Sequence, residues 1–468
     1  MAPPDRPAAP SGPVRRWRRA FNSRPALLIA FAFAVMADPV SSVAYAIEAA
    51  LRALDGDLGL LLATMALVIG IIALIVTNYH VLVGRFEGGG DAAAAGAAFG
   101  EAWAFIPIGA LVVDFVLTIA ISVSAASSAV IAYVPALAGV RIPMALGLLA
   151  AVAGLTWFGH IGRSVFAAMT IAFIALGGAV VIGGLGAPSV AHHAASAGSS
   201  HPAALAALLA FPVAMALATG VEAPSTAVAQ LGQLDTAGRR RFARITLWLT
   251  LGIVAALTIG LAAVAVRLGI GIPPAHSTQI ARVAHASVGP AVFALFQAST
   301  ALLLLAAASS SFQAGPGLLK ALARRTHLLE KGTGILHPQL GVVNVHHTPY
   351  WSVLVFVGVS AAVVAGAGAR DQELVLFYAV SVFMSFLMGL LAMARFSRRA
   401  RRWPLFAVNC LGAAVVALTL AFNLARGYPL VSMGAALAIA LLLYRLWVRD
   451  GRRGAISRAV VEAESSVP

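Results

Sequence analysis

Two short stretches of the chain place an acidic residue, a proline and two hydroxyl residues together inside an apolar run. In the first, "ADPVSSVAY", Asp38 and Pro39 are followed by Ser41 and Ser42. Proline removes a backbone N–H donor, clashes with the carbonyl four residues back and disfavours the helical conformation of the residue before it. An acid beside such a break brings charge to a place where backbone groups are free. This combination is suited to binding an ion or carrying a proton.

The second stretch, "ATGVEAPSTAVAQL", repeats the pattern with Glu222, Pro224, Ser225 and Thr226. The order is acid–Pro–x–Ser–Ser in the first stretch and acid–x–Pro–Ser–Thr in the second. A simple proline kink beside a neutral, hydrogen-bonded acid would explain either stretch alone. Their recurrence favours a matched pair of functional helix breaks.

The composition predicts an all-α integral membrane protein. Of the 468 residues, 60% are hydrophobic and only 10% are charged, and the mean hydropathy is +0.92. A soluble globular protein carries about a quarter charged residues. The single cysteine, Cys410, excludes a disulfide framework within the chain.

Apolar segments long enough to cross roughly 30 Å of hydrocarbon occur about twelve times. Their uniform hydrophobicity predicts helices, because the strands of a membrane barrel would be short and alternating. The predicted spans are residues 26–54, 59–84, 101–134, 142–160, 163–187, 205–230, 243–267, 284–312, 349–368, 373–394, 403–425 and 428–447.

The basic residues predict the orientation. With the N-terminus in the cytoplasm, 26 of the 32 lysines and arginines fall on the cytoplasmic side. Cytoplasmic loops of membrane proteins carry such an excess, so we expect a multi-pass protein of the cell membrane with both termini inside. The same asymmetry accounts for the net charge of +15 and excludes nucleic acid as a partner. Residues 1–25 are expected to be disordered and residues 448–468 to form a short cytoplasmic tail.

The two interruptions fall in the first and sixth predicted spans. Matched breaks in corresponding segments of two halves point to the binding site of a transporter, and irregular backbone at membrane depth is tolerated only where it lines a cavity. We therefore expect two inverted five-helix repeats, residues 26–187 and 205–396, followed by two more spans in residues 403–447.

A third acid joins the two breaks. Asp114 and Thr118 lie four residues apart in the third span and hence on one helical face. An acid in the middle of a span is costly and marks function, whereas a threonine or tyrosine there can equally serve packing. The polar side chains that converge on the two breaks are Asp38, Tyr45, Asp114, Thr118, Thr219, Glu222, Tyr378, Ser381 and Ser385.

The charge of these acids favours a cationic substrate. Two like charges 4 Å apart repel by about 4 kcal/mol at an effective dielectric constant near 20, so three acids disfavour an anionic group. Oxygen ligands suit a desolvated cation. Mutual repulsion also favours protonation of at least one acid, and Glu222 and Asp114 are the expected proton carriers.

Other polar features have simpler explanations. Glu48 and Arg52, four residues apart near the outer end of the first span, are expected to form a local ion pair. Asn78, Tyr79 and His80, near the inner end of the second span, are expected to be interfacial. The glycine-rich run "FEGGGDAAAAG" at 86–96 lacks the Lys-Ser/Thr of a phosphate loop and is expected to be a flexible cytoplasmic turn.

Other function classes lack their motifs. The sequence contains no HExxH, GxSxG or CxxC, so we expect no enzyme, no cofactor and no metal beyond a transported ion. It also lacks the TVGYG filter of potassium channels.

At these residues the chain resembles the amino acid–polyamine–organocation (APC) superfamily, whose members share the LeuT-type inverted repeat. More narrowly it resembles the KUP/KimA potassium-uptake permeases. The resemblance rests on "ADPVSSVAYAIEAAL", "FEGGGDA", "ALVVDFVLTIAISVSA" and "ATGVEAPSTAVAQL" and covers roughly residues 26–425. It implies a LeuT-type 5+5 repeat with broken first and sixth helices.

The resemblance also implies roles for the candidate ligands. In KimA-type proteins the ion is held by polar groups of the broken first helix and of the third, sixth and tenth helices. The residues that match here, the seven candidate ligands, are Asp38, Tyr45, Asp114, Thr118, Thr219, Glu222 and Tyr378. Two departures stand out. The family pattern has Ala-Leu where this chain has Pro39-Val40, and KimA-type proteins carry a C-terminal nucleotide-sensing domain for which residues 448–468 are too short.

The implied function is secondary active, proton-coupled import of a small cation, with K⁺ favoured, driven by the proton gradient. The alternative is a proton-coupled amino acid or polyamine permease. Amino-acid carriers of the superfamily hold a carboxylate on a glycine-rich break, and the first break here has no glycine. The expected partners are the lipid bilayer and the transported cation or small molecule, and an oligomer is possible.

Overall fold

The computed structural model describes residues 24–86, 90–158, 163–188, 202–227, 231, 234–327, 330–452 and 456. Most of the predicted N-terminal segment 1–25 and most of the predicted tail 448–468 lie outside these residues. Within them the helices and connecting loops are interrupted by one two-stranded hairpin, β1 (Arg324–His327) and β2 (Glu330–Thr333), which pair antiparallel.

Ten helices of the described part are long and apolar enough to cross a membrane. They are formed by α5 (Leu58–Leu82), η1 with α7 (Glu101–Ala104, Phe105–Tyr133), η2 with α8 (Pro135–Val140, Arg141–Trp157), α9 (Arg163–Gly186), α10 to α11 (Ala203–Ala214, with η3 at Met215–Ala218 and α11 at Ala223–Ala227), α12 (Thr236–Arg267), α14 (Pro290–Ala323), α16 (Asp371–Arg399), α17 (Trp403–Leu424) and α18 (Pro429–Arg449).

Two of the predicted spans are built differently. The first is divided into α2 (Arg24–Val35), α3 (Ala37–Ser41) and α4 (Val43–Ala53), and the ninth is the 17-residue apolar helix α15 (Tyr350–Gly366). Large apolar side chains point outward along the helices: Ile182 is 76% exposed and Val431 is 69% exposed. Such exposure is typical of a surface that faces lipid. The chain is a multi-pass membrane protein.

The eighth predicted span is displaced. It was expected at residues 284–312, whereas α14 begins at Pro290 and continues to Ala323. Gly289 has the extended backbone of a helix N-cap and Pro290 occupies the first helical position, which proline favours. Residues 284–287 belong to a separate short helix, α13 (Gln279–Ser287), whose N-cap is Thr278.

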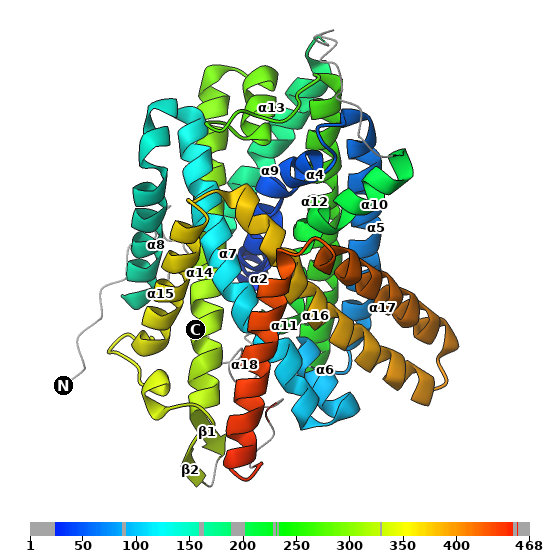
Figure 1. The fold of residues 1–468 in the computed structure, drawn as a ribbon, viewed down its shortest axis with the longest axis vertical. Helices are drawn as coiled ribbons and strands as arrows, with labels where there is room; N and C mark the ends of the chain where they lie inside the picture. Colours follow the sequence, from blue (N-terminus) through cyan, green and yellow to red (C-terminus); the bar gives the residue numbers. More distant parts are fainter. Residues whose placement is uncertain are drawn as a thin grey trace, which may run out of the picture.

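The molecule has two distinct ends (Figure 1). One carries α13 and α4, and the other carries α6 (Gly90–Phe99), the β1–β2 hairpin and the C-terminal end of α18. We call them the outer end and the inner end, after the orientation that the basic residues predict. A 3₁₀ turn, η5 (Pro338–Gly341), lies between the hairpin and α15.

The long helix α7 is central to the packing. It lies against α14 and α16, while α3 packs on α14 and α4 packs on α10. These contacts bring the first, third, sixth and tenth predicted spans together, so the candidate ligands come from elements that touch one another.

Candidate functional site

The first interruption is a kink and not an open break. Met36 and Ser42, which separate α2, α3 and α4, both keep right-handed helical dihedral angles (φ −73°, ψ −11° and φ −62°, ψ −25°). Helical hydrogen bonds continue across the first junction, since Val40 N donates to Met36 O at 2.9 Å. Pro39 therefore bends the span, and the expectation of an unwound first helix is wrong at this point.

The sixth interruption is open. After η3, Thr219 has an extended backbone (φ −53°, ψ 131°) and Gly220 has φ +69°, before α11 begins at Ala223. Residues with a Cβ rarely adopt positive φ, so Gly220 is the residue that permits this turn. Glu222 stands in the non-helical segment, as the sequence predicts.

The hydroxyl residues of the two interruptions make the same hydrogen bonds. Ser41 donates to the carbonyl of Asp38 and Ser225 donates to the carbonyl of Glu222, both at 2.7 Å. One residue further on, Ser42 and Thr226 likewise donate to carbonyls three residues back, those of Pro39 and Ala223. The carbonyls of Asp38, Pro39, Glu222 and Ala223 therefore each accept one side-chain hydroxyl.

The two interruptions lie against each other. A Cβ built on Gly220 would be only 2.7 Å from Oδ2 of Asp38, so Asp38 occupies the space that the glycine leaves. Ser42 also donates to the carbonyl of Leu217 in η3 at 3.2 Å. Tyr45 of α4 lies beside Thr219. The first and sixth interruptions are therefore in direct contact.

The third and tenth spans complete the cluster. Asp114 and Thr118 lie one turn apart on α7, and Thr118 Oγ1 is 3.3 Å from the hydroxyl of Tyr378 on α16. Asp114 also lies beside Tyr378 and interacts electrostatically with Asp38. All seven predicted ligands thus lie in one region between α3, α4, α7, the η3–α11 turn and α16.

The three acids of this cluster each have an oxygen without a partner. Oδ1 of Asp38, Oδ1 of Asp114 and Oε2 of Glu222 are buried and accept no hydrogen bond in the described part of the chain. The negative charge of Glu222 is opposed by Asp114 and Asp38. Buried polar atoms normally have partners, and unpaired buried charges are costly, so the cluster is suited to binding a cation or a proton.

The cluster is not a preformed metal centre. In the part of the chain that the structure describes, no three His, Cys, Asp or Glu side chains are placed to hold one metal ion. An ion bound here would combine at most two carboxylates with the hydroxyls of Tyr45, Thr118, Thr219 or Tyr378. A mixed shell of carboxylate and neutral oxygen suits a weakly held, exchangeable cation.

One acid of this region was missed by the sequence analysis. The glycine-rich run at 86–96 is not a flexible turn from residue 90 onward, because Gly90–Phe99 form α6 and Asp91 within it is only 5% exposed. Oδ2 of Asp91 accepts hydrogen bonds from Tyr79 at 2.6 Å and from Ser385 at 3.1 Å. Tyr79 is fully buried, so the expectation that it is interfacial is also wrong. Four alanines follow Asp91, and this run of strong helix formers was the available signal.

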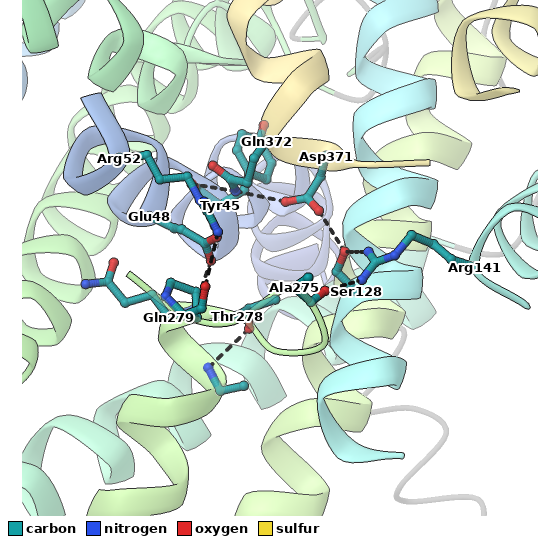
Figure 2. Close-up of polar contacts among 12 residues, drawn as sticks. Tyr45, Glu48, Arg52, Ser128, Arg141, Ala275, Thr278, Gln279, Asp371 and Gln372 are labelled. Atoms are coloured by element: carbon teal, nitrogen blue, oxygen red, sulfur yellow. Dashed lines mark hydrogen bonds and ion pairs between the residues drawn. The ribbon is translucent and has the colours of Figure 1, made fainter. Parts of the chain in front are cut away.

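A second polar group closes the outer end (Figure 2). Glu48 is buried at 4% exposure and pairs with Arg52 at 2.8 Å, which confirms the predicted ion pair. Its other oxygen accepts the backbone N–H of Gln279 at the start of α13, and Arg52 donates to the carbonyl of Pro273. Glu48 therefore ties the first span to the loop that carries α13.

The same network reaches the third and tenth spans. Arg141 donates to Ser128 on α7 and to the carbonyl of Ala275, both at 2.7 Å, and Ser128 donates to Asp371 on α16. Gln372 donates to Asp371 and to the carbonyl of Tyr45. The network thus reaches the backbone of Tyr45, one of the candidate ligands (Figure 2).

Comparison with known proteins points to transporters. No protein-family model matches the chain. The chain is 27% identical over 370 residues to the potassium transporter KimA of Bacillus subtilis (strain 168), an alignment that covers 75% of this chain. It spans 58% of the length of that relative. This relative is a transporter and not an enzyme, in agreement with the absence of enzyme motifs.

Solved structures of a manganese transporter from Eremococcus coleocola are also similar. One mutant of that protein aligns with a TM-score of 0.47 and 15% identity, over 94% of this chain and 97% of the other. Its complex with an aromatic bis-isothiourea compound aligns with a TM-score of 0.43 and 14% identity, over 96% and 97%.

Proposed function

We propose that the chain is a secondary active transporter that imports a small cation, K⁺ by preference, together with a proton. The observation that carries this proposal is a set of three acids with one unpartnered buried oxygen each: Asp38 and Glu222 at the two helix interruptions and Asp114 on α7. A site with several uncompensated negative charges gains stability when a cation enters, because repulsion among the acids is then relieved.

The surroundings of each acid suggest a division of roles. Asp38 lies beside Gly220 and close to Tyr45 and Thr219, so the cation is best placed there, among a carboxylate and several hydroxyls. Glu222 faces Asp114, Asp38 and Asp91 and has no cationic partner among the described residues, so protonation best relieves its charge. Asp114 interacts electrostatically with both and is the second proton carrier.

Two further findings support this function. The first is the similarity to a potassium transporter, which covers three quarters of the chain. The second is the direct contact between the interruptions of the first and sixth spans, where Asp38 lies against Gly220, since a transporter built of two repeats binds its substrate between such breaks. Membership of the APC superfamily is part of the same proposal.

Alternating access assigns a role to the outer network. The contacts of Glu48, Arg52 and Arg141 with the loop before α13 hold the outer end closed over the acid cluster. In our proposal these contacts break when the site opens outward and re-form after the cation has entered. The proton gradient then supplies the driving force for import.

The test is K⁺ uptake in cells that lack their own potassium importers. The wild-type chain should restore growth at low K⁺, and Asp38→Asn and Glu222→Gln should each abolish it. Glu373→Gln is the matched control, because Glu373 is 56% exposed at the outer end and pairs only loosely with Arg370. Failure of the wild-type chain to support any K⁺ uptake would exclude K⁺ as the cargo. Uptake of an amino acid or polyamine by the same cells would favour the alternative permease.

A further inference from the structure

Asp91 stands at the inner side of the acid cluster and is not used by the proposed cation site. It lies at the start of α6, a short helix outside the membrane spans that packs against α16 and α7. The start of α6 also adjoins the broken sixth span, because a Cβ on Gly90 would lie 3.1 Å from Cγ2 of Thr226 in α11. Asp91 is therefore held between the transport site and the inner end.

The contacts of Asp91 connect it to Glu222 through Tyr79. The Tyr79 hydroxyl donates to Oδ2 of Asp91 at 2.6 Å, a short bond of the kind that carboxylates make. Tyr79 also interacts electrostatically with Glu222, and Glu222 interacts with Asp91. The phenol is thus hydrogen-bonded to Asp91 and lies within electrostatic range of Glu222.

The remaining oxygen of Asp91 has no room for a metal cation on the side of α16. Oδ1 is buried and accepts no hydrogen bond from any described residue. It lies against Gly389 so closely that a Cβ built on this glycine would overlap it. An alkali ion needs several oxygen ligands around it, whereas a proton needs only one oxygen. The geometry favours a proton at Asp91.

We propose that Asp91 is the inner proton station of the transporter and that Tyr79 connects it to Glu222. The inference rests on the proposed proton-coupled function and adds the route by which the proton leaves.

Proton transfer from Glu222 to Asp91 through the Tyr79 phenol conserves both protons and charge. A proton leaving the carboxyl of Glu222 adds to the Tyr79 oxygen, directly or through a water molecule, while Tyr79 passes its own hydrogen to Oδ2 of Asp91. Glu222 is left as a carboxylate and Tyr79 is again a neutral phenol. Asp91 then releases its proton to water at the inner end, and the phenol rotates back to donate to the carboxylate.

The charged side chains on the described elements that pack around Asp91 do not offer the proton a second path. From α5 it is faced by Tyr79, whereas the neighbouring His80 is turned toward α12, where Trp248 donates to it. From α16 it is faced by Ser385, whereas Arg395 lies over the ring of Phe99 at the other end of α6.

The other elements near Asp91 contribute only acids. The turn before α11 contributes Glu222, and Asp114 of α7 interacts with Tyr79. Glu101 of η1 follows Asp91 by ten residues and lies beyond the far end of α6. No lysine, arginine or histidine of the described residues forms an ion pair with Asp91.

The acidity of Asp91 fits this role. Burial raises the pKa of Asp91 to about 7, and the hydrogen bonds from Tyr79 and Ser385 only partly oppose the shift. An acid whose pKa lies near the working pH can both take up and release a proton. We therefore expect proton flux to be greatest near pH 7 in the wild-type protein.

The test separates proton release from cation exchange in the purified, reconstituted protein. Liposomes containing a pH-sensitive dye report proton movement driven by a K⁺ gradient, and exchange of Rb⁺ for K⁺ at equal concentrations reports cation binding and site opening. Asp91→Asn and Tyr79→Phe should lower K⁺-driven proton flux by about 100-fold and remove its pH maximum, with exchange kept within about twofold.

Matched controls use the same chemical changes elsewhere at the inner end. Asp235→Asn keeps an N-cap of α12, and Tyr444→Phe keeps the ring contacts of α18 with Phe105; both should leave proton flux unchanged. Equal loss of flux and exchange in Asp91→Asn and Tyr79→Phe, or unchanged flux in both, would overturn the inference. Absence of K⁺-driven proton flux in the wild-type protein would instead overturn the proposed function.

Discussion

The outer network and the acid cluster are both buried polar groups, but they differ in whether their charges have partners. In the outer network both oxygens of Glu48 accept hydrogen bonds, one from Arg52 and the other from the Gln279 backbone. Both oxygens of Asp371 are likewise bonded, by Ser128 and Gln372. In the acid cluster, Asp38, Asp114 and Glu222 each keep an oxygen without a donor.

This difference separates a structural contact from a binding site. A buried charge with all its partners stabilises the arrangement that supplies them, whereas an unpartnered one destabilises the empty protein until a ligand arrives. Substitution of a paired acid should therefore lower stability and leave cation binding intact. Substitution of an unpaired acid should weaken cation binding and leave stability equal or higher.

Among substitutions that leave Asp38 and its surroundings in place, Asp114→Asn should have the largest effect on function. The amide cannot supply the charge that the cation or proton needs, and cation binding should weaken by about 10- to 100-fold. The free energy of unfolding without cation should stay equal or rise by about 1 kcal/mol, because repulsion with Asp38 and Glu222 is relieved. Thermal unfolding of the purified variant with and without K⁺ checks both. A marked loss of stability without K⁺ would show that Asp114 is a structural acid.

Gly220→Ala tests where the unpaired Asp38 lies. A side chain at φ +69° costs about 1–2 kcal/mol, and its Cβ would also displace the Asp38 carboxylate. Gly56→Ala is the matched control, because Gly56 has φ +85° at the outer end but meets only the Ile272 side chain, at 3.4 Å. Both variants should lose stability, and only Gly220→Ala should lose K⁺ uptake. Equal uptake in the two would place the cation away from Asp38.

Glu48→Ala should lower stability and leave cation binding intact, so its effect on function should be the smallest of the three. Removal of the carboxylate leaves the Gln279 backbone N–H and Arg52 without their acceptor, and the free energy of unfolding should fall by about 1–2 kcal/mol. Arg52 is 38% exposed and can turn to water, which limits the loss. The stabilisation that K⁺ provides should be the same as in the wild-type protein. A variant of normal stability that no longer responds to K⁺ would reverse the comparison.

Much of the site could be predicted because it contains acids and prolines, which are energetically unfavourable inside a membrane span. An acid or a proline inside an apolar span stands out from the sequence alone, and all seven candidate ligands lie together in the structure. The helix–helix contacts that bring Thr118 and Tyr378 within 3.3 Å depend on tertiary packing, yet the family resemblance anticipated them.

Other features could not be predicted for physical reasons. Pro39 bends the first span without opening it, because neither neighbouring junction has a glycine that could adopt a positive φ as Gly220 does. The burial of Asp91 depends on α16 covering α6 at Gly389, a contact between residues about three hundred positions apart. Local sequence around residue 90 shows only glycines and alanines, which gives no indication of such a covering helix.

The most direct test of the account is a thermal-shift titration of the purified wild-type protein and Asp38→Asn with K⁺, Rb⁺, amino acids and polyamines. A ligand that binds only the folded state raises its stability in proportion to the logarithm of its concentration. We predict that K⁺ and Rb⁺ stabilise the wild-type protein and have no effect on Asp38→Asn. Equal stabilisation of both proteins by K⁺, or stabilisation of the wild type by an amino acid alone, would contradict a cation site at Asp38.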